Sequence, residues 1–148
     1  MVLTASQAKD RLIGAWKLLS FHTTLITPSG TTTHQPMGAN ALGRLLFTAD
    51  GWMSTLGNDP SNMIVPTSPW ITASDAELAV VARHVSSYIG QCQVFVKEGE
   101  VRLSTQVHVS LGPSWVGTQQ ERRVKLKMEE GRELVVLRPV EELPAPVS

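Results

Sequence analysis

Apolar and polar residues alternate with a period of two along the second half of the chain, as they do in half-buried strands. Turn-forming residues separate the runs at Glu98-Gly99, at Gly112-Pro113 and at Glu129-Glu130-Gly131. We therefore expect consecutive antiparallel strands joined by short turns, over residues 88–97, 101–111, 117–128 and 133–138.

The first half of the chain shows the same pattern less regularly. An apolar-rich run over residues 15–26 stops at Pro28-Ser29-Gly30 and predicts a first strand. Residues 42–48 and 52–56 flank Ala49-Asp50-Gly51, a combination that favours a hairpin.

Two segments carry helix-capping signals. Thr4 and Gln7 have the spacing of a capping box, so we expect a short helix that ends at Gly14. Residues 74–87 contain a second box and follow a Pro-, Ser- and Asn-rich stretch, 58–72, which we interpret as a long loop. This loop and helix either form a lid or cavity wall, or the helix only covers one flank of the sheet.

Consecutive strands joined by short turns favour an all-β fold with short helices, because a closed sheet has no exposed edges. We expect a closed antiparallel up-and-down β-barrel of about eight strands, wide enough to hold one small ligand. The N-terminal helix would lie at one end, with one helix, about 74–87, inserted between strands. Residues 1–140 would form this single domain, and residues 141–148 a Pro-rich tail.

Charged residues show which face of each strand is turned to solvent, because successive side chains alternate. In the strand at 117–128, Arg123 and Lys125 belong to the charged face, so Gln120 and Arg122 should point inward.

The same reasoning applies to the two strands before it. Lys97 marks the outer face of its strand and places Tyr88 and Cys92 inside. In the next strand Arg102 marks the outside, so the inner residues would be Val101, Leu103, Val107 and Val109. This register leaves His108 outside unless a bulge shifts it.

The composition excludes several classes of partner. Thirteen basic and thirteen acidic residues leave no net charge that would recruit nucleic acid or an anionic membrane. The lone Cys92 rules out an intrachain disulfide and favours a reducing compartment. The N-terminal residues do not have the pattern of a signal peptide, and we expect a cytoplasmic protein. A homodimer is compatible with the sequence.

Several stretches carry a family likeness. Gly14-Ala15-Trp16, after the short helix, matches the Gly-x-Trp signature of lipocalins, and Arg138 lies where lipocalins place an arginine against that tryptophan. Longer matching stretches are LIGAWKLLSF (12–21), GRLLFTADGWMS (43–54) and VSLGPSWVGTQQERRVKL (109–126). Over nearly its whole length the chain resembles the bacterial and fungal lipocalin-like domain family.

This resemblance implies a barrel in which Trp16 and Arg138 have a structural role and seal one end. It also implies either a ligand carrier or a cofactor-independent enzyme of natural-product biosynthesis, since the fold does not settle the chemistry. The sequence departs from the expected pattern at Gln106 and His108, where a His/Glu-type pair would stand. No acid–base role is therefore carried over to that pair.

Familiar catalytic motifs are missing from the sequence. It contains no Gly-x-Ser-x-Gly elbow, no phosphate-binding glycine loop, no dinucleotide fingerprint and no Cys-x-x-Cys. The four histidines lack paired metal-ligand spacing. We expect neither a cofactor nor a metal.

The inward polar residues are the candidate site. Arg122 either plugs the barrel with Gln120 and a carboxylate or backbone carbonyls, or binds a carbonyl, enolate or carboxylate of a ligand. His22, on the Trp16 face of the first strand, is either a general acid or base or a hydrogen-bonded wall residue. The candidate catalytic residues are His22, Tyr88 and Arg122, and the candidate binding residues are Trp52, Cys92, His108 and Gln120. For Cys92 a packed, inert thiol is the alternative, and for Trp52 a place in the core.

The predicted function is the cofactor-independent isomerisation or cyclisation of a small hydrophobic metabolite, polyketide- or terpenoid-like, in secondary-metabolite biosynthesis. The alternative is a non-catalytic carrier of a small apolar ligand. Two or more unpaired polar groups facing an open cavity would favour an enzyme. A purely apolar cavity with Arg122 fully paired would favour a carrier.

Overall fold

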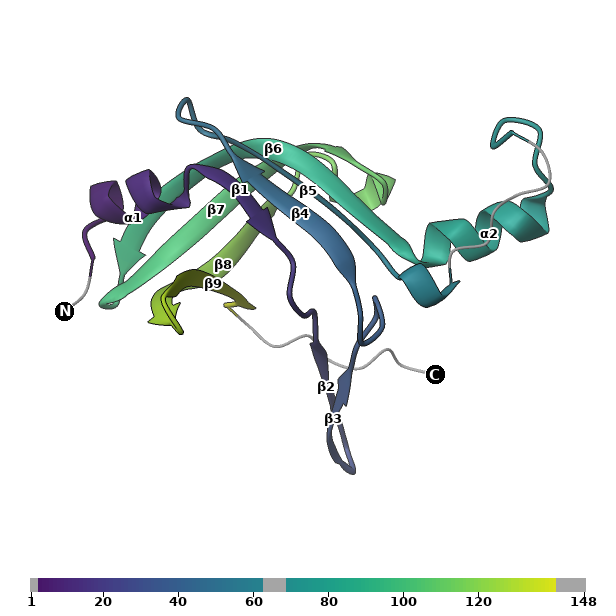
Figure 1. The fold of residues 1–148 in the computed structure, drawn as a ribbon, viewed down its shortest axis with the longest axis horizontal. Coiled ribbons are helices and arrows are strands. Elements are labelled where there is room, and N and C mark those ends of the chain that lie inside the picture. The colour runs from purple at the N-terminus through teal and green to yellow at the C-terminus, as the bar shows by residue number, and fades with distance from the viewer. Residues whose placement is uncertain (1–2, 63–68, 141–148) are drawn as a thin grey trace. The chain divides into compact units, whose positions relative to one another are not determined.

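The computed structural model describes residues 3–62 and 69–140, so residues 63–68 of the predicted loop and the predicted tail at 141–148 lie outside the described part. The described part is all-β with two short α-helices (Figure 1). Its elements are α1 (Ala5–Leu12), β1 (Gly14–Lys17), β2 (Thr23–Thr27), β3 (Gly30–His34), β4 (Leu42–Phe47), β5 (Trp52–Asn58), α2 (Asp75–Arg83), β6 (Val85–Lys97), β7 (Glu100–Ser110), β8 (Gln119–Glu129) and β9 (Arg132–Pro139). Short 3-10 turns lie at Pro60–Asn62 and Pro113–Trp115. Neither described helix is long and apolar enough to cross a membrane.

Seven strands form one sheet in the order β1-β4-β5-β6-β7-β8-β9, and β2 pairs with β3 in a separate two-stranded ribbon. The order begins at β1 and ends at β9, and no ladder joins these two strands within residues 3–62 and 69–140. The sheet is therefore open in the described part of the chain. The closed barrel of about eight strands expected from the sequence is not confirmed.

The chain divides into two compact units. Within the described residues the first unit comprises residues 3–15, 46–54 and 88–140, and the second comprises 16–45, 55–62 and 69–87. The first unit contains the long strands that carry most of the candidate residues.

Strands β6 to β9 form successive antiparallel hairpins, as the alternating pattern predicted (Figure 1). Two of the turns have two central residues with positive φ, Glu98-Gly99 at 54° and 74° and Glu130-Gly131 at 52° and 77°. Two left-handed residues give the backbone twist that matches adjoining strands, and glycine adopts this conformation without steric cost. Local turn chemistry thus fixes the register of these hairpins.

A β-bulge interrupts the β6–β7 ladder at its far end. Gly90 pairs with Val107 but Ile89 pairs with Val109, so His108 is the extra residue. The bulge reverses the alternation in β7, and Val109 is 61% exposed whereas Val107 is buried. The prediction that Val109 faces inward was therefore wrong.

Helix α1 packs on the first unit through one face. The predicted capping box is present, with the Thr4 side chain accepting from the Gln7 amide and the Gln7 side chain accepting from the Thr4 amide. Ala8 and Leu12 are buried. Arg11 Nε donates to Glu133 Oε1 at 2.6 Å, which ties α1 to β9.

The second unit departs from the sequence expectations at two places. Helix α2 has the predicted cap at Ser74 but ends at Arg83, short of the predicted residue 87. His84 leaves the helical conformation and its ring hydrogen-bonds to the Val80 carbonyl, while its own carbonyl accepts from the Asp59 amide. The β-branched Val85 then begins β6.

The predicted first strand at 15–26 is also divided. It forms β1 and β2 with residues 18–22 between them, because β2 folds back at Pro28-Ser29 onto the threonine-rich β3. His22 is therefore exposed and outside any strand, not on a strand face shared with Trp16.

Candidate functional site

One face of β6, β7 and β8 combines buried apolar residues with polar side chains, and we call it the inner face. Its centre is Leu103, Thr105 and Val107, each at most 2% exposed. The ladders pair Thr105 with Cys92 and Gln120, and pair Leu103 with Arg122. Directly paired residues share a face, so Cys92, Gln120 and Arg122 lie together on the inner face as predicted.

Tyr88 joins this set at the bulged end of the sheet. Tyr88 and Cys92 are an even number of residues apart on β6, so they share a face. The Tyr88 ring meets the Trp115 ring edge to face, with centroids 5.4 Å apart. Burial raises the pKa of the Tyr88 phenol, the charge of Arg122 partly offsets this, and Cys92 adds to it. The phenol therefore stays protonated at neutral pH.

Arg122 is half-buried, and its partner is a backbone carbonyl, one of the two kinds of partner predicted for a plug. Its Nη1 donates to the backbone carbonyl of Glu121 at 2.9 Å. Among the described residues it forms no ion pair, whereas Arg102 on the opposite face lies within 4 Å of three glutamates, Glu98, Glu100 and Glu121. Arg122 can thus offer most of its donors to a bound molecule.

Gln120 and Cys92 complete the polar lining. Gln120 Nε2 donates to Thr118 Oγ1 at 2.9 Å, and Thr118 Oγ1 donates to the Trp115 carbonyl at 2.6 Å, so the amide is held towards the Trp115 turn. Burial raises the pKa of the Cys92 thiol, and Lys9 partly offsets this. Cys92 is therefore a neutral thiol at neutral pH.

The inner face offers hydrogen-bond donors and one positive charge, but these four residues provide no base. Tyr88 and Cys92 both keep their protons, and guanidinium and amide groups do not accept protons at neutral pH. The arrangement suits an electron-rich oxygen on an apolar molecule.

Trp52 and His108 are brought together, away from that set. Their rings meet edge to face with centroids 5.1 Å apart. Met53, the neighbour of Trp52, is buried at 2% exposure, so alternation places Trp52 on the outer face, and His108 is exposed at the bulge. The binding role of this pair stays a prediction, as does the catalytic role of His22, which belongs to the second unit.

Trp16 and Arg138 were expected to pack together. Trp16 is half-buried, and Arg138 is exposed on β9, where it pairs with Arg123. Their stacking stays a prediction.

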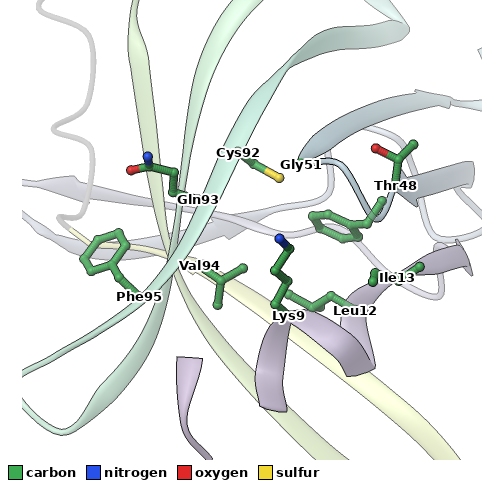
Figure 2. Close-up of a pocket in the computed structure, with 10 residues that line it drawn as sticks. Lys9, Leu12, Ile13, Thr48, Gly51, Cys92, Gln93, Val94 and Phe95 are labelled. Carbon is green, nitrogen blue, oxygen red and sulfur yellow. The ribbon is translucent and has the colours of Figure 1, made fainter. Parts of the chain in front are cut away.

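A pocket of about 340 Å³ lies within the first unit between α1, the β4–β5 turn and β6. Figure 2 shows Lys9 and Cys92 pointing towards one another across it, with Val94 beside them, while Gln93 and Phe95 point away. The Cys92 amide donates to the Gly51 carbonyl at 2.8 Å and ties the turn to β6. We call this the α1 pocket.

Sequence reasoning missed Lys9 and Trp115 as site residues. The capping box predicted α1 but not which of its side chains would face the sheet. Trp115 lies in one of the stretches that resemble the lipocalin-like family, after the break at Gly112-Pro113, and this resemblance is the sequence signal that could have identified it.

Comparisons with known proteins agree with this architecture. A family model described as a lipocalin-like domain matches residues 13–144. The 4'-hydroxy-3'-methoxypropiophenone carrier protein of Aspergillus oryzae is 36% identical over 62 residues, 39% of this chain and 56% of that protein. The chain thus spans a little over half the length of this relative. No solved structure matches at a significant level.

Proposed function

Because the chain belongs to the lipocalin-like domain family, we propose that it binds one small, largely apolar molecule on the inner face. A carbonyl or phenolic oxygen of that molecule accepts hydrogen bonds from Arg122 and Tyr88. The apolar body lies on Leu103 and Val107, and Trp115 borders it at the bulged end.

One observation carries this proposal: a guanidinium lies on an apolar face with no carboxylate partner among the described residues. A half-buried cation of this kind is favourable only where water or a ligand supplies the missing acceptors. Tyr88 lies close enough for the Arg122 charge to affect its pKa. This supports our inference that one ligand oxygen accepts from both groups, and charge-assisted hydrogen bonds of this type are strong.

Binding without catalysis is the function that we favour. Isomerisation or cyclisation needs a base, and Tyr88, Cys92, Gln120 and Arg122 provide none. The name of the Aspergillus oryzae relative, a carrier of an aromatic ketone that also bears a phenol, agrees in kind with the oxygen acceptor proposed here.

Closure of the sheet belongs to the same proposal. We infer that β1 and β9 complete a barrel around the ligand. The hydrogen bond between Arg11 and Glu133 supports this, because it holds α1, which directly precedes β1, against β9.

Calorimetric titration with 4'-hydroxy-3'-methoxypropiophenone tests the proposal. We expect one site, and about a ten-fold or greater loss of affinity in Arg122→Met, because a charge-assisted hydrogen bond contributes ~1.5–3 kcal/mol. Arg123→Met is the matched control: the same residue type one position along, exposed on the outer face. Equal binding by Arg122→Met and wild type would contradict the proposal.

Catalysis is the second candidate, and the protonated Tyr88 beside Arg122 favours it, because this pair suits an enolate. The base would then come from a group other than the four residues described above. Exchange of the α-protons of the same ketone in heavy water, followed by NMR, would show turnover. If Tyr88 is involved, Tyr88→Phe should slow that exchange, whereas an exchange rate equal to that without protein would contradict catalysis of enolisation.

A further inference from the structure

The α1 pocket contains one charged residue among those that line it, and that residue is Lys9. Its walls include the apolar side chains of Leu12, Phe47 and Val94, of which Leu12 and Phe47 are buried. A single cation at an apolar hollow is a specific arrangement, since apolar walls select the body of a ligand and the charge selects its polar end.

Lys9 forms no ion pair among the described residues, and this includes the acidic residue next to it on α1 and the one in the turn that borders the pocket. Asp10 is its neighbour on α1, and successive side chains on a helix do not face each other. Asp50, in the β4–β5 turn beside the lining residues Thr48 and Gly51, accepts a hydrogen bond from the Thr48 hydroxyl at 2.5 Å. The Lys9 ammonium is thus available to a ligand.

The ammonium is directed into the pocket. Figure 2 shows the Lys9 side chain extending from α1 towards the Cys92 sulfur. Its charge also lowers the pKa of Cys92 against the larger effect of burial, so the two groups share one environment. The helix that carries Lys9 is itself fixed at both ends, by its capping box and by the hydrogen bond from Arg11 to Glu133.

We propose that the α1 pocket is a second binding site, separate from the contacts of Arg122 and Tyr88, and that it takes a small amphiphilic anion. The apolar body packs on Leu12, Phe47 and Val94, and a carboxylate accepts a hydrogen bond from Lys9 Nζ. The pocket volume of about 340 Å³ is at the lower end of ligand sites, which limits the body to about one aromatic ring with a short side chain.

Paired probes of nearly equal shape test the charge requirement: 3-phenylpropionate and its neutral amide, titrated by calorimetry. We expect the acid to bind at least about ten-fold more tightly than the amide. Lys9→Met keeps most of the side-chain length and the helix propensity, so it should remove this preference and leave the affinity for the amide unchanged. Lys125→Met, on the exposed outer face of β8, is the matched control and should retain the preference.

The single cysteine reports a bound probe, and because Cys92 also belongs to the inner face, its protection counts for the α1 pocket only if it persists in Arg122→Met. Cys92 lines the pocket and is the only thiol in the sequence, so saturating 3-phenylpropionate should slow its alkylation by iodoacetamide several-fold. Arg122→Met should keep both the preference and the protection, which separates this site from the one proposed above. Equal affinity for acid and amide, absence of binding by the acid at millimolar concentration, or binding without protection of Cys92 would each overturn the proposal.

Discussion

Arg122 and Arg123 are neighbours in the sequence with different surroundings. Arg123 is exposed, lies near Glu100 and donates to the Val140 carbonyl, whereas Arg122 is on the inner face with one backbone acceptor. The alternation of charge in the sequence was sufficient to predict this difference. It could not predict whether Arg122 has a carboxylate partner, because that depends on residues from other strands.

The absence of a carboxylate partner for Arg122 among the described residues has a consequence for stability. Removing one member of a buried ion pair costs ~3–5 kcal/mol, because the other charge is left unpaired. Arg122→Met keeps most of the volume and leaves no such charge behind, so we expect the free energy of unfolding in urea to change by less than about 1 kcal/mol. A loss of several kcal/mol would show that Arg122 is a structural plug.

Tyr88 is the single tyrosine of the chain, so phenolate absorbance reports on it alone. Because burial raises its pKa, we expect a midpoint above the usual 10.0 in the folded protein. The folded state then holds the proton more tightly than the unfolded state. The associated stability is present below about pH 10 and is lost as the pH rises towards the higher folded pKa.

The same titration tests the proximity of Arg122. Its charge lowers the Tyr88 pKa, so Arg122→Met should move the midpoint further up, while Arg123→Met should leave it in place. A midpoint that does not respond to Arg122→Met would show that the Arg122 charge does not act on Tyr88.

The elements were predictable where local chemistry decides them and not where distant contacts do. The hairpins of β6 to β9 follow from turn residues and alternation, and both helices begin at their predicted caps. The end of α2, the separate β2–β3 ribbon and the bulge at His108 depend on tertiary contacts that no short sequence pattern records.

Gly90 explains why the bulge occurs where it does. A Cβ on Gly90 would lie 2.0 Å from the Gln106 carbonyl oxygen, so the β7 backbone approaches β6 more closely than any other residue would permit. We expect Gly90→Ala to destabilise the protein by ~1–3 kcal/mol in urea unfolding, as overpacking does. Gly112→Ala is the control, because its φ is −88° and its Cβ would meet only Ser110 Oγ, at 4.0 Å. Equal stability of the two variants would contradict this close approach.

At the scale of the whole molecule the resemblance predicted the family, and the family model covers most of the chain. Closure was not decidable from strand patterns, because pairing between the first and last strands is the most distant contact in the sequence.

Hydrogen exchange measures closure of the sheet. If β1 and β9 pair, the β9 amides that do not face β8 should be protected as well as those that do. Rapid exchange at every second residue between Leu134 and Leu137 would show that β9 is a free edge.

The most direct test of ligand binding on the inner face is an NMR titration of the backbone amides with the aromatic ketone probe. We expect saturable shifts along β6, β7 and β8 at Cys92, Leu103, Thr105, Gln120 and Arg122, with small changes at the outer-face positions Arg102, Arg123 and Lys125. Saturable shifts confined to the outer face or to α2, or no shifts at all, would contradict the central claim.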